Sequence, residues 1–425
     1  MRMFSRPRPG LAFAVALATL GILVPAPGRS AESGPIKVAL LAPTSGSAAA
    51  AGHDMVAGWT LYWKEHGDKV AGRTIVTTVY DTNTNPGKAL DQARRAVEQD
   101  GAQMIVGPYL ANEGLAVAPY GIQHRIPMFF PTVSADDLSQ RQANAFVIKV
   151  AGWTSSQTTH VAGEWAYEQG HRKVMTLANS YAFGYENAGG FSQTFTRKGG
   201  RIVGQIWAPL GTADYTPYIS QVQAANPDAL FVEMVGADAV HFLQQWSQLG
   251  LKNKIPLIAN ETTTDQSNIR SLDPALVEGI TSFGHFAEGR DAPATRAFVQ
   301  KYSKAEGVLP SYMATSFYTA AQWIGRGIEA VHGNTAEAGT FLRAVREIKL
   351  ADSPFGPMVL DQYGAPIDNV YIRKVVATTG DAAKYAKTWN VVTKTYPNVS
   401  QFWTWKAADY LKQPPYSPTF QGYSK

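Results

Sequence analysis

Short apolar runs alternate with amphipathic segments along the chain from residue 36 onward. The first apolar or β-branched runs, which predict strands, are Ile36–Leu41, Thr74–Tyr80, Ala102–Val106 and Ile126–Phe130. The segments between them carry apolar residues at helical spacing, as Met55, Trp59 and Trp63 do. Strands that alternate with helices in this way lie parallel in one sheet, with helices covering its faces.

A second alternating set begins after Ala145–Val150. Its predicted strands are Lys173–Ala178, Ile202–Trp207, Asp228–Met234 and Pro256–Ala259, and its predicted helices include Glu186–Lys198, Pro217–Ala225 and Ala237–Leu249. The pattern therefore predicts an α/β protein with two doubly wound parallel-sheet lobes.

The alternation stops after Gly279–Phe286, where three helices are predicted in succession over residues 293–306, 311–331 and 336–348. The second sheet has no room for three more helices, so we expect them to return to the first lobe. The predicted division is lobe one over residues 35–150 and 284–353, and lobe two over residues 151–283 and 354–386. Residues 387–425, rich in Trp, Tyr and Pro, are expected to wrap the surface as a tail.

The N-terminus has the three regions of a secretory signal peptide. Arginines at positions 2, 6 and 8 precede the apolar run Leu11–Val24, and small residues follow up to Ser30. We expect cleavage after Ser30 and a periplasmic protein. Removing residues 1–30 takes away four arginines and no acidic residue, so 34 Lys and Arg remain against 33 Asp and Glu. A nearly neutral chain gives no reason to expect a nucleic-acid partner.

Catalytic and metal-binding motifs are missing from the sequence. The absence of cysteine excludes a thiol nucleophile and Cys-ligated metals. Neither the nucleophile elbow G-x-S-x-G nor a nucleotide-binding glycine loop occurs. His285 lies near a predicted crossing between the lobes, where a packed role is the alternative to a cleft role. We predict a protein that is no enzyme and needs no cofactor or metal. A secreted hydrolase would need a nucleophile or metal set, and a receptor would need a spanning helix, which is not expected before Lys425.

Ligands of open α/β sheets bind beyond the carboxyl ends of the strands. In lobe one this rule selects residues 43–52, 107–112 and 131–135, and in lobe two residues 179–185, 233–238 and 260–265. Thr132 and Ser134 end a strand and open a helix, where hydroxyls and free N–H groups suit a carboxylate; alternatively, Ser134 only caps that helix. Tyr109, Tyr181 and Phe183 offer flat apolar surface in such loops.

Several ordered motifs carry a family resemblance. They are VALLAPTSG, NPGKALDQARRAVEQDGAQMIVGP, IPMFFPTVSADDL, the helix start at Asp214 and Tyr215 before NPDALFV, and VSQFWTW. With these motifs the chain resembles the type 1 periplasmic binding proteins, in particular the branch of leucine/isoleucine/valine-binding and related aromatic-acid-binding proteins. The resemblance implies two lobes joined by three crossings, near residues 150–153, 279–286 and 354–361.

The resemblance also implies positions for a binding site. The family's carboxylate-binding positions fall on Ala111, with Asn112 beside it, and on Val133 and Ser134, while its ammonium-binding Glu falls on Glu261. Its two lobe-two tyrosines fall near Phe183 and Ala237, so two hydroxyls are missing, which favours an apolar or planar ligand. The full set of candidate ligand-binding residues is Tyr109, Ala111, Asn112, Thr132, Val133, Ser134, Tyr181, Phe183, Gly236 and Glu261.

The resemblance and the strand-end loops together predict a solute-binding component of an ABC importer. It is expected to be a monomer that closes by a hinge on a small carboxylate and delivers it to a permease in the inner membrane. A hydrophobic amino acid or similar acid is the first expectation for the ligand, and an aromatic acid is the second. A ligand-sensing protein is a further alternative.

Overall fold

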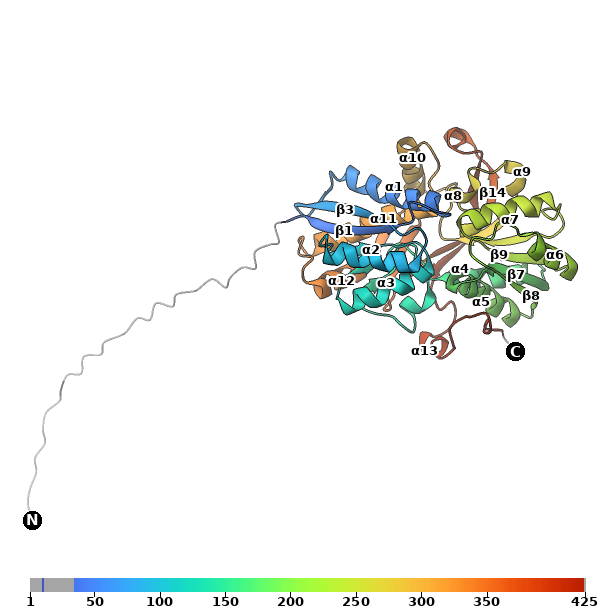
Figure 1. Ribbon diagram of the computed structural model, residues 1–425, viewed down its shortest axis with the longest axis horizontal. Helices are drawn as coiled ribbons and strands as arrows, with labels where there is room; N and C mark the ends of the chain where they lie inside the picture. The colour runs from blue at the N-terminus through green and yellow to red at the C-terminus, as the bar shows by residue number, and fades with distance from the viewer. Residues whose placement is uncertain (1–9, 11–33, 424–425) are drawn as a thin grey trace, which may run out of the picture.

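The computed structural model describes residue 10 and residues 34–423. These residues form two α/β lobes that lie side by side (Figure 1). The predicted signal peptide, apart from Gly10, falls outside the described residues. Within the described residues, none of the helices combines the length and the apolar character that a membrane crossing requires.

Lobe one contains a six-stranded sheet. In spatial order its strands are β2 (Lys69–Val70), β3 (Arg73–Asp81), β1 (Ile36–Ala42), β4 (Met104–Val106), β5 (Met128–Phe129) and β6 (Val147–Ile148). All neighbours are parallel except β2 and β3. Strand β1 lies in the middle because six of its seven residues are buried, as a strand covered on both faces requires.

Helices from two distant parts of the sequence cover this sheet. They are α1 (Ala49–Glu65), α2 (Pro86–Glu98) and α3 (Ala111–Gln123), and, after the chain has passed through lobe two, α10 (Pro293–Glu306), α11 (Tyr312–Ala330) and α12 (Ala338–Glu347). Helix α1 packs closely on α11, since a Cβ atom at Gly58 would lie 2.0 Å from the Ala314 carbonyl oxygen. The helices after residue 293 therefore belong to the core of lobe one.

Lobe two contains a nine-stranded sheet. Its strands, in spatial order, are β12 (Leu350–Ser353), β13 (Gly356–Leu360), β14 (Pro366–Ala377), β11 (Thr281–Gly284), β10 (Leu257–Asn260), β9 (Ala229–Glu233), β7 (Lys173–Asn179) and β8 (Arg201–Ala208), and β15 (Thr388–Val399) also pairs with β14. The stretch from β11 to β8 is parallel. Its helices are α4 (Ser155–Glu168), α5 (Ala182–Arg197), α6 (Thr216–Ala225), α7 (Gly236–Gln248), α8 (Gln266–Ile269) and α9 (Pro274–Val277).

Strand β15 corrects the expectation that the chain from residue 387 onward is a tail wrapping the surface. Residues 388–399 run antiparallel to β14. The segment TWNVVTKTY is rich in β-branched and aromatic residues, which favour an extended, half-buried strand. Only the residues after β15, including the short helix α13 (Ala407–Tyr410), lie across the outside of the sheet and its helices (Figure 1).

The two lobes contact each other directly. On one side of the cleft Arg270, just after α8, forms an ion pair with Asp54 of α1 at 3.1 Å. On another, the Asp136 N–H, in the short 3-10 helix η1 (Asp136–Ser139), donates to Glu186 Oε1 of α5 at 3.1 Å. These contacts enclose the space beyond the carboxyl ends of both parallel sheets.

Candidate functional site

A small cavity lies between the lobes. Its free volume is about 10 Å³, enough for roughly one water molecule, so the two walls stand close together in this arrangement. Its wall consists of Tyr109, Leu110, Ala111, Thr132, Ser134 and Tyr312 from lobe one, and Tyr181, Phe183, Val235 and Thr262 from lobe two. None of these side chains carries a charge, and four of them are aromatic. The chemistry of the wall therefore suits a flat molecule with few polar groups.

The lobe-one wall is built where β4 and β5 end. Ala111 is the first residue of α3, so its backbone N–H has no acceptor within the helix. The turn before it is fixed by Glu113, whose carboxylate accepts from the Leu110 N–H at 2.8 Å. The Thr132 hydroxyl donates to the Pro108 carbonyl at 3.2 Å, which ties the two strand-end loops together.

Ser134 lies on the cavity wall and does not cap a helix. The residue in the cap position of η1 is Ala135, one residue later. The Ser134 Oγ accepts from the Ser155 hydroxyl at 3.2 Å, which leaves its own proton available to a ligand. Of the two roles that the sequence allowed for Ser134, the structure is consistent with the ligand-facing one.

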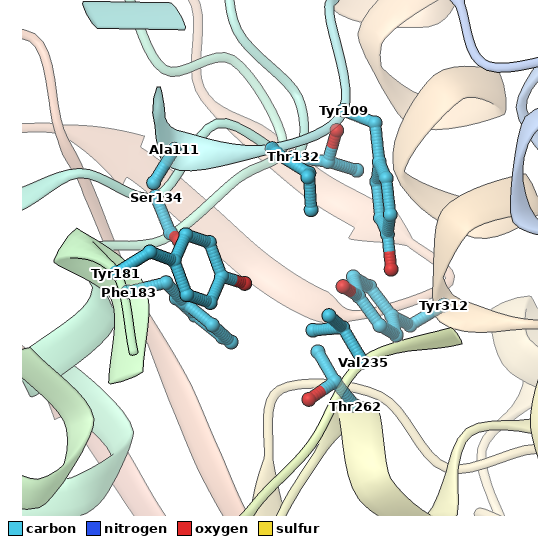
Figure 2. Close-up of a pocket in the computed structure, with 10 residues that line it drawn as sticks. Tyr109, Ala111, Thr132, Ser134, Tyr181, Phe183, Val235, Thr262 and Tyr312 are labelled. Atoms are coloured by element: carbon cyan, nitrogen blue, oxygen red, sulfur yellow. The ribbon is translucent and has the colours of Figure 1, made fainter. Parts of the chain in front are cut away.

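Three phenol hydroxyls face the cavity. Figure 2 shows the hydroxyls of Tyr109, Tyr181 and Tyr312 directed toward the space between them. Burial raises the pKa of each of the three above the ordinary value of a phenol, and nearby acidic groups raise it further. The three hydroxyls therefore stay neutral at physiological pH and can donate or accept hydrogen bonds.

The lobe-two wall starts at the N-terminus of α5. This helix begins at Ala182, four residues before the predicted start, so Tyr181 and Phe183 lie at a helix end rather than in a loop. Val235 is held in place by its N–H, which donates to Asn179 Oδ1 at 3.2 Å. The Thr262 hydroxyl donates to the Met234 carbonyl at 2.8 Å and presents its methyl group to the cavity.

Four of the predicted site residues do not line this cavity. Asn112 uses its side chain within α3, where Oδ1 accepts from the Glu113 N–H. Val133 points into the core, because its side chain fills the space beside Gly114. Gly236 lies in a neighbouring cleft, opposite Ser47 and Ala48.

Glu261, the predicted partner of a ligand ammonium, is instead part of a buried charge cluster. Its carboxylate pairs with Arg373 of β14 at 2.9 Å and accepts from His285 Nδ1 at 2.5 Å. All three side chains are at most 1% exposed. Burial lowers the pKa of His285, so its imidazole is neutral. His285 is thus a packed residue, and the cluster joins β10, β11 and β14 inside lobe two.

Four wall residues are not among the candidates predicted from the sequence: Leu110, Val235, Thr262 and Tyr312. The first three lie inside the strand-end loops that the sheet rule selects, so their position in those loops is the signal that identifies them. Tyr312 gives no such signal, because it starts a helix that follows no strand of lobe one.

Comparisons with known proteins extend over most of the described chain. The sequence profile of a family described as periplasmic binding protein matches residues 35–382. Leu/Ile/Val-binding protein homolog 6 of Brucella melitensis is 28% identical over 358 residues, which cover 83% of this chain and 90% of that protein.

Solved structures show the same two-lobed fold. An ABC transporter substrate-binding protein from Sphaerobacter thermophilus superposes with a TM-score of 0.79 at 26% identity, covering 86% of this chain and 99% of the other. A solute-binding protein of an ABC transporter from Rhodopseudomonas palustris BisB5, solved with 3,4-dihydroxybenzoic acid, has a TM-score of 0.81 at 26% identity, covering 86% and 98%. The α/β fold class predicted from the sequence is confirmed.

Proposed function

We propose, from the premise that this chain belongs to the periplasmic binding protein family, that it captures a small aromatic carboxylate between its two lobes. In coarser terms the chain is a substrate-binding protein of the ABC-transporter type. The ligand class is carried by one observation: the cavity wall has four aromatic rings and no charged side chain.

The uncharged wall argues against an α-amino acid. Such a ligand brings an ammonium group, and a buried ammonium without a carboxylate costs several kcal/mol. Glu261 is engaged by Arg373 and His285 and is not on the wall. An aromatic acid has no ammonium to satisfy, and its ring gains from packing on tyrosine and phenylalanine. The preference between the two ligands foreseen from the sequence is therefore reversed.

The carboxylate end of the ligand is assigned to lobe one. There the Ser134 hydroxyl and the N–H of Ala111, at the N-terminus of α3, offer donors on one side of the cavity (Figure 2). Donors at a helix N-terminus favour anions. The phenols of Tyr181 and Tyr312 would then face the ring and its substituents.

Hinge closure is the mechanism that this wall supports. A ligand that contacts both lobes gains those contacts only when the lobes are shut, so it shifts the population toward the closed arrangement. We further propose that the protein acts as a monomer in the periplasm after removal of residues 1–30. The closed, loaded form is the one that a permease in the inner membrane would recognise.

A branched aliphatic amino acid is the second candidate. It is favoured by the name of the Brucella melitensis relative and by two aliphatic wall residues, Leu110 and Val235. Its ammonium would have to bind neutral hydroxyl and carbonyl oxygens.

A ligand panel tests the proposal. Protein freed of ligand by unfolding and refolding is titrated calorimetrically with benzoate, 4-hydroxybenzoate, leucine and valine, and its thermal unfolding is followed with each. A ligand at about 100 times its Kd should add roughly 2.7 kcal/mol of stability. Stabilisation by the aromatic acids alone supports the proposal. Stabilisation by leucine or valine alone selects the second candidate, and no response to any of the four refutes both.

A further inference from the structure

Lys149 is a fully buried cation directly behind the loop that carries Ser134. It follows β6 and is 0% exposed. Its Nζ donates to the carbonyl oxygens of Ser134 at 3.0 Å and Ala135 at 2.5 Å. Lysine is rarely buried completely. A fully buried lysine that donates to two carbonyls of a binding-site loop therefore points to a role in that site.

The loop is held from lobe two as well. The Ser155 N–H, at the start of α4, donates to the Ser134 carbonyl at 2.9 Å. Asp136 Oδ1 accepts from the Ser156 N–H at 3.1 Å, while the Asp136 N–H donates to Glu186. A peptide unit is planar, so holding the carbonyl groups of Ser134 and Ala135 fixes the planes of their peptides. This fixes the orientation of the loop and, with it, the direction of the Ser134 side chain.

Carboxyl groups surround the ammonium of Lys149. Burial lowers the pKa of Lys149 to about 8, opposed by the carboxyl groups of Asp136, Glu186, Asp137 and Asp361. Burial raises the pKa of Asp136 to about 6 and raises that of Glu186 further above its ordinary range. At neutral pH the ammonium is therefore mostly protonated and the Asp136 carboxyl is mostly ionised. Of the two charges, the ammonium is the one bonded to the Ser134 carbonyl, whereas the Asp136 carboxylate accepts from the Ser156 N–H of lobe two. The hydrogen bonds of Lys149 go to carbonyl oxygens, and its ammonium does not form a direct ion pair with a carboxylate of the described residues.

The cavity wall itself offers no positive charge to an anion. We propose that Lys149 is a positioning and specificity-determining residue of the carboxylate site, supplying through the Ser134 loop the positive potential that an anion in the cavity needs. This inference rests on the proposed capture of a carboxylate. A charge acts over several ångströms in a buried, low-dielectric setting, so contact with the ligand is not required.

The chain offers variants that separate charge from support. Lys149→Met removes the cation. Because it leaves Asp136 without a compensating charge, the double variant Lys149→Met with Asp136→Asn serves as a second, neutral version. Ser155→Ala is the control for support of the loop without charge, since it removes an uncharged hydroxyl that lies 3.1 Å from the Ser134 carbonyl oxygen and 3.2 Å from Ser134 Oγ.

The readout is the preference for a carboxylate over its neutral amide. Calorimetry gives the Kd of each variant for 4-hydroxybenzoate and for 4-hydroxybenzamide. We expect both Lys149 variants to weaken carboxylate binding by about tenfold or more, with amide binding changed less than about threefold. Ser155→Ala should shift both ligands by the same small factor.

Two results would overturn the role of Lys149. One is an equal loss for carboxylate and amide, which means that Lys149 only supports the loop. The other is unchanged carboxylate affinity in both Lys149 variants. If the wild type binds leucine rather than the aromatic acid, the comparison is made with leucine and leucinamide. The proposed aromatic ligand is then wrong, but the role of Lys149 is still tested. A wild type that binds no carboxylate overturns both.

Discussion

Replacing Glu261 with glutamine should lower stability strongly and leave ligand affinity nearly unchanged. The carboxylate accepts from Arg373 Nη1 at 2.9 Å, from His285 Nδ1 at 2.5 Å, and from the N–H groups of His285 at 3.2 Å and Phe286 at 3.0 Å. A glutamine side chain has one acceptor oxygen and turns its NH₂ group toward donors. The variant therefore loses a buried ion pair and sets donor against donor.

The expected loss can be estimated from these contacts. Removing one partner of a buried ion pair costs about 3–5 kcal/mol, because the other charge stays buried. Arg373 keeps hydrogen bonds to the Phe286 carbonyl and to the Thr264 and Ser282 hydroxyls, which places the loss near the lower end. About 3 kcal/mol corresponds to a fall in Tm of roughly 6 °C at the low end of the range for large domains.

Urea denaturation measures the free energy of unfolding, and calorimetric titration measures ligand affinity on the folded variant. Glu306→Gln, at an exposed position of α10, is the control and should change stability by less than about 0.5 kcal/mol. A double variant with Arg373→Met should recover part of the loss, because it removes the unpaired guanidinium. Unchanged stability in Glu261→Gln, together with a tenfold or greater loss of ligand affinity, would refute the structural role and restore Glu261 as a ligand contact.

Four further outcomes are expected. Ser134→Ala should weaken carboxylate binding by about tenfold while costing less than about 1 kcal/mol of stability; equal losses in calorimetry and denaturation would make Ser134 a structural residue. Tyr312→Phe should weaken binding of 4-hydroxybenzoate by about fivefold relative to benzoate, and an equal effect on both would show that this hydroxyl does not contact the ring substituent. Asp54→Asn breaks the ion pair with Arg270 across the cleft, so small-angle scattering of the ligand-free variant should show a larger radius of gyration than the wild type. Burial raises the pKa of Glu233 to about 8, above the roughly 4.3 of an unfolded chain, so the folded state holds a proton that the unfolded state releases. The free energy of unfolding should then fall as pH rises from about 4 to about 8, and Glu233→Gln should flatten that slope in denaturation curves.

The architecture of the sheets could be predicted because its signals are local. A run such as Ile36–Ala42 is apolar at every position except Lys37, as expected of a strand covered on both faces. The β15 segment was not predicted because five of its twelve residues are exposed and its place depends on β14, a partner that the local pattern does not reveal. Strand pairing of this antiparallel kind depends on a distant neighbour more than on the segment itself.

The candidate site was predicted to the extent that it follows from strand ends. Tyr109, Ala111, Thr132, Ser134, Tyr181 and Phe183 were predicted site residues and line the cavity. Glu261 also follows a strand end, but its side chain meets Arg373 from β14, more than 100 residues later in the chain. A carboxylate at a strand end can either contact a ligand or pair with a cation inside the lobe. The outcome depends on a cation far away in the sequence, and residue spacing does not reveal where that cation lies.

Tyr312, a wall residue that the sequence does not predict, also contributes to closure of the lobes. Its N–H, at the N-terminus of α11 in lobe one, donates across the cleft to Asp265 Oδ2 of lobe two at 2.9 Å. Opening the lobes would break this bond and withdraw Tyr181 and Phe183 from the cavity at the same time, so wall formation and closure are one event. To move the lobes from 1:99 to 99:1 closed, a ligand needs about 5.5 kcal/mol of extra affinity for the closed form. Divided over the four lobe-two wall residues, this is roughly 1.4 kcal/mol each, within the range of a buried aromatic or aliphatic contact. A ligand as small as one aromatic acid can therefore drive closure, provided that it contacts the lobe-two wall throughout.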